Sequence, residues 1–140
     1  MKCMFNGVGE AFDEQLPNCS LWLEAFPGGT SRTVLLDCGF TAPFALFAHL
    51  GRDTALDLDM VWISHFHGDH FLGLPALLLR FWEEGRDKPL TIVGQEGIEE
   101  KTFQAMDLAY DGVRQRFSFP VEFQQAIPEA TLLPLGLSLG

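Results

Sequence analysis

Short apolar runs separated by turn residues occupy most of the chain, and they predict β-strands. The segments 19–26 and 33–37 are rich in apolar residues, and the Pro-Gly-Gly-Thr-Ser sequence at 27–31 between them favours a turn, so we expect a hairpin. Asp57 to Ser64 is predicted to be a third strand. The run Leu-Thr-Ile-Val at 90–93 is predicted to be a short buried strand.

Apolar residues at helical spacing predict helices between these strands. Gly73 to Glu84 is expected to be helical because Pro75 suits a first turn and the apolar residues share one face. Gln95 to Tyr110 is a second helix, and Pro43 to Leu50 is a short candidate whose period is ambiguous. The residues expected on the packed faces are Phe44, Phe47, His49 and Leu50 in the first helix along the chain, Leu74, Leu77, Leu78 and Phe81 in the next, and Ile98, Phe103, Met106 and Tyr110 in the last.

Strands that alternate with helices indicate an α/β layered fold. A length of 140 residues with 47% apolar residues suits one ordinary domain with a real core. Beyond the last helix we expect extended pieces at 116–119 and 121–126. The last ten residues, 131–140, are almost wholly apolar, so we interpret them as a strand cut short or one that needs another surface to cover it.

The net charge of −10 argues against an extended nucleic-acid-binding surface, because phosphate contacts need clustered Lys and Arg. The basic residues are scattered, and Arg80 and Arg86 are best explained as solvated surface residues. An anionic substrate stays compatible with this charge, because bound metal ions would restore positive charge locally.

Neither the start of the chain nor its apolar stretches indicate export or a membrane span. Residues 1–7 contain no apolar core of a signal peptide, and the stretch 71–79 is too short to cross a bilayer. Cys3, Cys19 and Cys38 form no paired spacing, so we expect reduced, mostly buried thiols. These features predict a cytoplasmic protein without a membrane partner.

The sequence His-Phe-His-Gly-Asp-His at 65–70 carries the candidate chemistry. In an extended backbone the side chains of His65 and His67 point the same way and can reach one metal ion together. Gly68 permits a tight turn, after which Asp69 and His70 aim at a second point nearby. Imidazole nitrogens and a carboxylate suit Zn²⁺, with Mn²⁺ or Fe²⁺ as alternatives, and two such ions can share a hydroxide and clamp a phosphoryl or carbonyl oxygen.

His65-x-His67-x-Asp69-His70 after an apolar strand resembles the metallo-β-lactamase superfamily of dinuclear metal hydrolases. Asp37, at the end of the strand 33–37, matches the first motif of that superfamily. The continuation of the loop into Gly-Leu-Pro at 73–75 is most similar to the ribonuclease Z-like branch. Gly-x-Gly at 7–9 and Asn-Cys-Ser at 18–20 also resemble that branch, though each is a weak signal alone.

The resemblance implies a fold and a set of residue roles. It implies the N-terminal half of an αββα sandwich, with one mixed β-sheet and helices on one face. His65 and His67 would bind the first metal and Asp69 and His70 the second. Asp69 would also be a candidate general base, and Asp37 would orient the loop through hydrogen bonds.

The resemblance also implies ligands that this sequence lacks. The superfamily takes a further histidine, a bridging aspartate and a last histidine from its second half, whereas no histidine follows His70 here. His49 precedes the loop and is better explained as a helix-end residue than as a ligand. We therefore expect residues 1–140 to form one incomplete metallo-β-lactamase-like domain, with self-association or a missing C-terminal half to cover its open sheet.

Two functions follow as hypotheses. The first is a metal-dependent hydrolase, most similar to a ribonuclease Z-like phosphodiesterase, in which a metal-bound hydroxide attacks a phosphodiester or ester-like bond. The alternative is a truncated or degenerate half-domain without catalysis that binds metal weakly or serves as an interaction module.

The ligand assignment predicts a contrast between two histidines. His67→Ala should remove residual bound metal, whereas His49→Ala should leave the metal content of the purified protein unchanged. Equal losses of metal in the two variants, measured by elemental analysis, would contradict the assignment.

Overall fold

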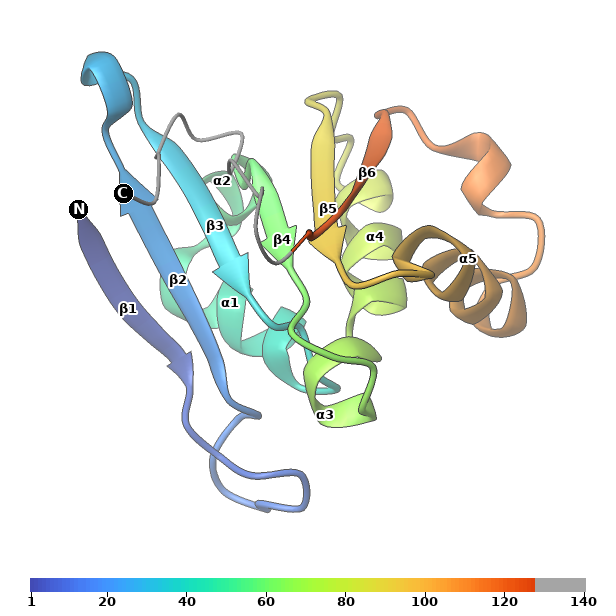
Figure 1. The fold of residues 1–140 in the computed structure, drawn as a ribbon, viewed down its shortest axis with the longest axis horizontal. Helices are drawn as coiled ribbons and strands as arrows, with labels where there is room; N and C mark the ends of the chain where they lie inside the picture. Colours follow the sequence, from blue (N-terminus) through green and yellow to red (C-terminus); the bar gives the residue numbers. More distant parts are fainter. Residues whose placement is uncertain (128–140) are drawn as a thin grey trace.

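The computed structural model describes residues 1–127, so the predicted strand at 131–140 lies outside the described residues. Its main feature is a single six-stranded sheet with strand order β1-β2-β3-β4-β5-β6 (Figure 1). β1, β2 and β3 pair antiparallel, and β3 to β6 pair parallel, which makes the sheet mixed as predicted. The strands are β1 (Lys2–Gly7), β2 (Ser20–Ala25), β3 (Arg32–Leu36), β4 (Met60–Trp62), β5 (Leu90–Gly94) and β6 (Val121–Gln125).

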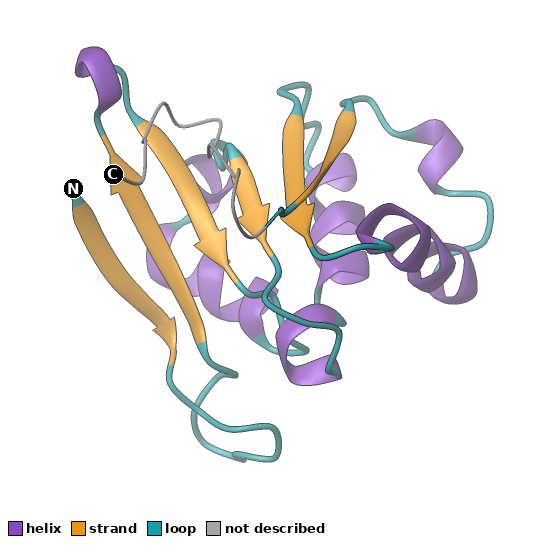
Figure 2. Cartoon of the chain, in the orientation of Figure 1, coloured by secondary structure: helices purple, strands orange, loops and turns teal. Residues whose placement is uncertain are grey.

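Helices connect the parallel strands and lie on one side of the sheet. Figure 2 shows α1, α2 and α4 behind it, with α5 beyond the β6 edge. The helices are α1 (Ala42–Leu50), α2 (Arg52–Leu56), α3 (Gly68–Phe71), α4 (Leu74–Glu83) and α5 (Ile98–Ala109), and short 3-10 turns cover Pro27–Gly29 and Arg114–Arg116. The α/β class and the mixed sheet agree with the prediction. Within residues 1–127, no helix is long and apolar enough to span a membrane.

The sheet buries its two faces unequally. Successive residues of a strand point to opposite faces, so Leu35, Val61 and Ile92 pack against the helices in the main core. Their neighbours point to the other face and form a second, smaller cluster that no helix covers within residues 1–127 (Figure 1). We call this face the open face. Its residues are Val34, Met60 and Val93, with the partly buried Leu23, Leu36, Trp62 and Ala126 packed against them.

Several local expectations are confirmed. The hairpin forms as predicted, with Leu23 of β2 opposite Val34 of β3. The two longer helices also form, and Leu74, Leu77, Leu78 and Phe81 of α4 are all fully buried. Apolar periodicity therefore located the elements that carry most of the core.

Other expectations were wrong at particular positions. β1 was not predicted, because its sequence Lys-Cys-Met-Phe-Asn-Gly has no clear alternation and it lies at the edge of the sheet. In α1, Phe47 is buried and Leu50 packs against the core as expected, but Phe44 is 65% exposed and His49 is also exposed. Ala42, Ala45 and Leu46 are buried in their place. The piece expected to be extended at 116–119 begins instead with the 3-10 turn Arg114–Arg116.

The prediction of mostly buried cysteines was also wrong. All three are free thiols, but Cys3 and Cys19 are exposed and only Cys38 is buried. Burial, helped by the nearby charge of Asp37, strongly raises the pKa of the Cys38 thiol, so this residue is a neutral part of the core at physiological pH.

Arg86 is buried rather than solvated, contrary to the expectation. Its side chain is 3% exposed, and burial lowers the pKa of its guanidinium to about 10. The guanidinium donates hydrogen bonds to the backbone carbonyls of Leu56, Leu58, Lys88 and Pro89, at 2.7 Å for Leu58, Lys88 and Pro89. Arg86 thus ties the end of α2 and the segment before β4 to the segment that leads into β5.

Removal of this guanidinium should leave buried carbonyl groups without donors. We expect Arg86→Ala to lower the free energy of unfolding by about 3 kcal/mol, since each unpaired buried polar group costs roughly 1–3 kcal/mol. Arg116→Ala is the matched control: Arg116 is exposed and its guanidinium overlies the Trp82 ring, so its loss should cost less than about 1 kcal/mol in chemical denaturation. Similar losses in both variants would refute this role of Arg86.

Candidate metal centre

The candidate site begins where two parallel strands end side by side. Leu36 of β3 is paired with Trp62 of β4, so the residues that follow each strand meet at the same edge of the sheet. The backbone N–H of Asp37 donates to the carbonyl of Trp62 at 2.7 Å, which continues the pairing by one residue. Asp37 and Ser64 are therefore neighbours in space.

The Asp37 carboxylate connects the two strand ends and residues 65–70, which we call the histidine loop. Its Oδ1 accepts the backbone N–H of Ser64 at 2.7 Å, and its Oδ2 accepts the Ser64 hydroxyl at 2.8 Å. His70 Nδ1 lies 2.8 Å from the same Oδ2. Asp37 also has a φ of 61°, a left-handed conformation that non-glycine residues seldom adopt. These hydrogen bonds hold the carboxylate against both Ser64 and His70, and the orienting role of Asp37 in metal binding stays a prediction.

The side chains of the histidine loop gather at this edge. The ring of His65 lies 4.7 Å from that of His67 and 4.3 Å from that of His70, measured between centroids. Asp69 Oδ2 lies 3.2 Å from His70 Nε2. His67 is exposed and the other three residues are partly exposed, so solvent ions can reach the loop.

A short helix and two phenylalanines fix the path of the loop. His67 has extended dihedral angles, φ −63° and ψ 145°, and directly precedes the four-residue helix α3. Phe71 at the end of α3 is buried, and its ring packs edge-on against Phe66 with 5.2 Å between centroids. The histidines therefore point out of a loop whose aromatic residues anchor it to the core.

Glycine allows the segment after Asp37 to lie against the loop. The backbone N–H of Cys38 donates to the carbonyl of His70, and that of Gly73 donates to the carbonyl of Cys38, both at 2.8 Å. A Cβ on Gly39 would stand 1.9 Å from the carbonyl oxygen of Asp69, which leaves no room for a side chain. The sequence analysis missed both Ser64 and Gly39 as site residues, although Ser64 directly precedes His65 and Gly39 follows Asp37 by two positions.

The donors are of the kinds that bind a metal ion, and one pair of them has suitable spacing, but they are too few at one point to hold the ion alone. Two ligands bound to one zinc ion at about 2.0–2.1 Å stand roughly 3 Å apart, close to the 3.2 Å between Asp69 Oδ2 and His70 Nε2. Within residues 1–127, however, no group of three or more His, Cys, Asp or Glu side chains is arranged to hold a metal ion. His49, in the exposed last turn of α1, is not brought into the loop's hydrogen-bonded network.

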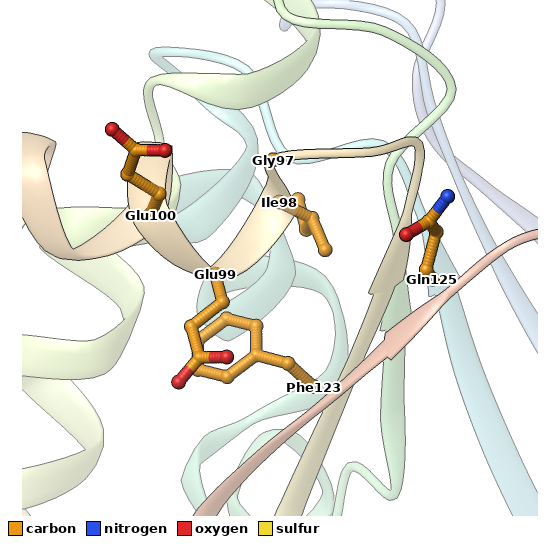
Figure 3. Close-up of a pocket in the computed structure, with 6 residues that line it drawn as sticks. All are labelled: Gly97, Ile98, Glu99, Glu100, Phe123 and Gln125. Atoms are coloured by element: carbon orange, nitrogen blue, oxygen red, sulfur yellow. The ribbon is translucent and has the colours of Figure 1, made fainter.

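A separate hollow lies beside the site, between the start of α5 and β6. It has a volume of about 490 Å³, and Figure 3 shows Ile98, Phe123 and Gln125 around it together with two acidic side chains, Glu99 and Glu100. None of the loop residues lines it. α5 itself approaches the loop, since Lys101 Nζ lies 5.1 Å from the centroid of the Phe66 ring.

Comparison with known proteins gives consistent matches. The family described as "Anti-Pycsar protein Apyc1" matches residues 1–106. Ribonuclease Z of Staphylococcus carnosus is 43% identical over 130 residues, and ribonuclease Z of Shouchella clausii is 32% identical over 123 residues, each match covering 88% of this chain. These matches cover only 39% and 38% of the two relatives, so the chain spans about two fifths of their length.

Solved structures share the fold. The short form of human tRNase Z superposes with a TM-score of 0.68 at 26% identity, covering 91% of this chain and 46% of the human one. The metallo-β-lactamase fold protein YhfI from Bacillus subtilis superposes with a TM-score of 0.67 at 20% identity, covering 94% and 47%. The strand order and the helical layer described above are thus those of a known metallo-β-lactamase fold.

The close approach at Gly39 predicts a sharp effect of one added methyl group. Gly39→Ala should push residue 69 away, lower the free energy of unfolding by about 2 kcal/mol, and weaken zinc binding. Gly28→Ala is the control: Gly28 has a φ of 60° but no atom within 4 Å of an added Cβ, so we expect only a strain of about 1 kcal/mol and unchanged zinc binding. Unaltered zinc titration of Gly39→Ala would contradict the steric argument.

Proposed function

Because the chain belongs to the Anti-Pycsar protein Apyc1 family and to the ribonuclease Z-like branch of the metallo-β-lactamase superfamily, we propose that it carries half of the active site of a metal-dependent phosphodiesterase. The observation that carries the proposal is the gathering of three imidazoles and a carboxylate at the carboxyl ends of β3 and β4, where Asp37 contacts His70 directly and His65 through Ser64. We also propose that the whole protein is catalytically active.

The residues have separate roles in this proposal. His65 and His67 hold a first metal ion, and Asp69 and His70 hold a second. When bound, zinc supplies a water-derived nucleophile at neutral pH and polarises the oxygen of the scissile group, and Mn²⁺ or Fe²⁺ are alternatives. Asp69 is also the candidate general base, a role that the resemblance to ribonuclease Z-like enzymes implies and that its partly exposed carboxylate permits. Asp37 orients the loop without contacting the substrate.

A phosphodiester is the substrate class that we favour, with other ester-like bonds as the alternative. The names of the ribonuclease Z relatives support an RNA phosphodiester. The net charge of −10 argues against an extended RNA-gripping surface on this part of the protein, so contacts beyond the reacting phosphate have to come from elsewhere or the substrate is small. The three free cysteines support a cytoplasmic location, which is also part of the proposal.

The complete site needs additional ligands, because a catalytic zinc normally has three protein ligands. We propose that a second half, of the kind that the superfamily uses, supplies them and covers the open face.

A second candidate function has its own support. Within residues 1–127 no three-ligand group exists, and no helix covers the open face, where the partly buried Leu36 and Trp62 pack against the buried cluster. These observations favour a non-catalytic half-domain that binds metal weakly and associates with itself or a partner. Light scattering of the purified chain tests the association directly.

If the protein is a metal-dependent phosphodiesterase, bound metal and hydrolysis of a phosphodiester should be found together. Protein that carries the complete site should contain two metal ions per site and hydrolyse bis(p-nitrophenyl) phosphate, and Asp69→Ala should reduce turnover by roughly 100-fold or more. Asp53→Ala, at an acid of α2 whose side chain is 95% exposed, should leave turnover unchanged. Less than one metal ion per site and no turnover, measured with the second half present, would favour the non-catalytic half-domain.

A further inference from the structure

Ser64 links a second histidine to the Asp37 carboxylate. Its hydroxyl oxygen lies 2.8 Å from Asp37 Oδ2 and 2.9 Å from His65 Nδ1, so it stands between the two groups. The backbone N–H of Ser64 donates to the other carboxylate oxygen of Asp37 at 2.7 Å. The residue is therefore held at both its main chain and its side chain by one aspartate.

The number of protons available decides which group donates and which accepts in the contacts that run from Asp37 through Ser64 to His65. An ionised carboxylate can only accept hydrogen bonds, so the single hydroxyl proton of Ser64 is donated to Asp37. The Ser64 oxygen then has only lone pairs to offer His65, and the 2.9 Å contact is a hydrogen bond only if His65 Nδ1 carries a proton. A neutral His65 ring with a proton on Nδ1 keeps its lone pair on Nε2.

We propose that Ser64 is a positioning residue that selects the tautomer and the ring orientation of His65. Asp37 fixes His70 directly through Nδ1 and fixes His65 through the Ser64 hydroxyl. One carboxylate thereby turns the Nε2 atoms of two imidazoles toward the proposed metal ions. A hydrogen-bond partner on the far nitrogen of a ligating histidine typically changes metal affinity by 10- to 100-fold.

The inferred role of Ser64 in metal binding rests on the proposed function. Its effect on the tautomer of His65, however, exists in the metal-free protein and can be measured there. Long-range ¹H–¹⁵N NMR of histidine side chains, at a pH of about 8.5 where an ordinary imidazole is neutral, reports which ring nitrogen is protonated. His65→Gln assigns the His65 signals. We expect the wild-type protein to show His65 with its proton on Nδ1.

Three variants separate positioning from general stability. Ser64→Ala should shift His65 toward the other tautomer and weaken zinc binding by roughly 10- to 100-fold. Ser64→Thr keeps the hydroxyl and should restore both properties. Ser20→Ala is the matched control, because the Ser20 hydroxyl donates to the backbone carbonyl of Asp37 at 2.8 Å rather than to its carboxylate, so the His65 tautomer should not change.

The outcomes are distinct. A wild-type His65 protonated on Nε2, or a tautomer unaltered in Ser64→Ala, overturns the role of Ser64. The expected tautomers in a wild-type protein that binds no zinc would establish the role of Ser64 and count against the proposed function. Should Ser64→Ala not fold, the tautomers of the wild type and of Ser64→Thr still decide the question.

Discussion

The site depends on the hydrogen bonds that the Asp37 carboxylate makes at the ends of two parallel strands. Through Ser64 and His70 this one group joins the end of β3, the end of β4 and the helix α3. The left-handed backbone of Asp37 aims the carboxylate between the strands, and Gly39 lets the next segment lie against Asp69 without a side chain between them. If the carboxylate were lost, the histidine loop would remain tethered at Phe71, but its imidazoles would lose their orientation.

The electrostatic arrangement of the loop suits a cation. His70 lies between two carboxylates, with Nδ1 2.8 Å from Asp37 and Nε2 3.2 Å from Asp69. A neutral imidazole can donate from only one nitrogen, so its other nitrogen and the facing carboxylate are both acceptors unless a proton or a metal ion lies between them. Either a proton on His70 or a bound cation would resolve this contact, and under the proposed function ligands from a further segment would complete the coordination of that cation.

The unequal faces of the sheet explain why the same structure suggests both an enzyme and an association module. On the helical side, residues such as Leu35, Leu46 and Phe81 are fully buried. The buried Arg86 hydrogen-bonds to backbone carbonyls of the segments that precede β4 and β5. On the open face, a small cluster around Met60 packs with side chains of the sheet, and no helix within residues 1–127 covers it. The helical face thus forms a fully packed core, whereas the open face offers apolar side chains on which a second layer can pack.

Local patterns in the sequence were sufficient for several of the elements. Apolar spacing identified the β2–β3 hairpin, α4 and α5, because strand and helix periods are properties of short segments. The spacing of His65, His67, Asp69 and His70 likewise predicted a metal-binding loop, which stays a prediction. Only the tertiary structure decided that Ser64 bridges Asp37 and His65, that Gly39 must lack a side chain, that Arg86 is buried and that residues 2–7 add an edge strand. These features depend on contacts between segments far apart in the chain, whose partners no local pattern of apolar and polar residues specifies.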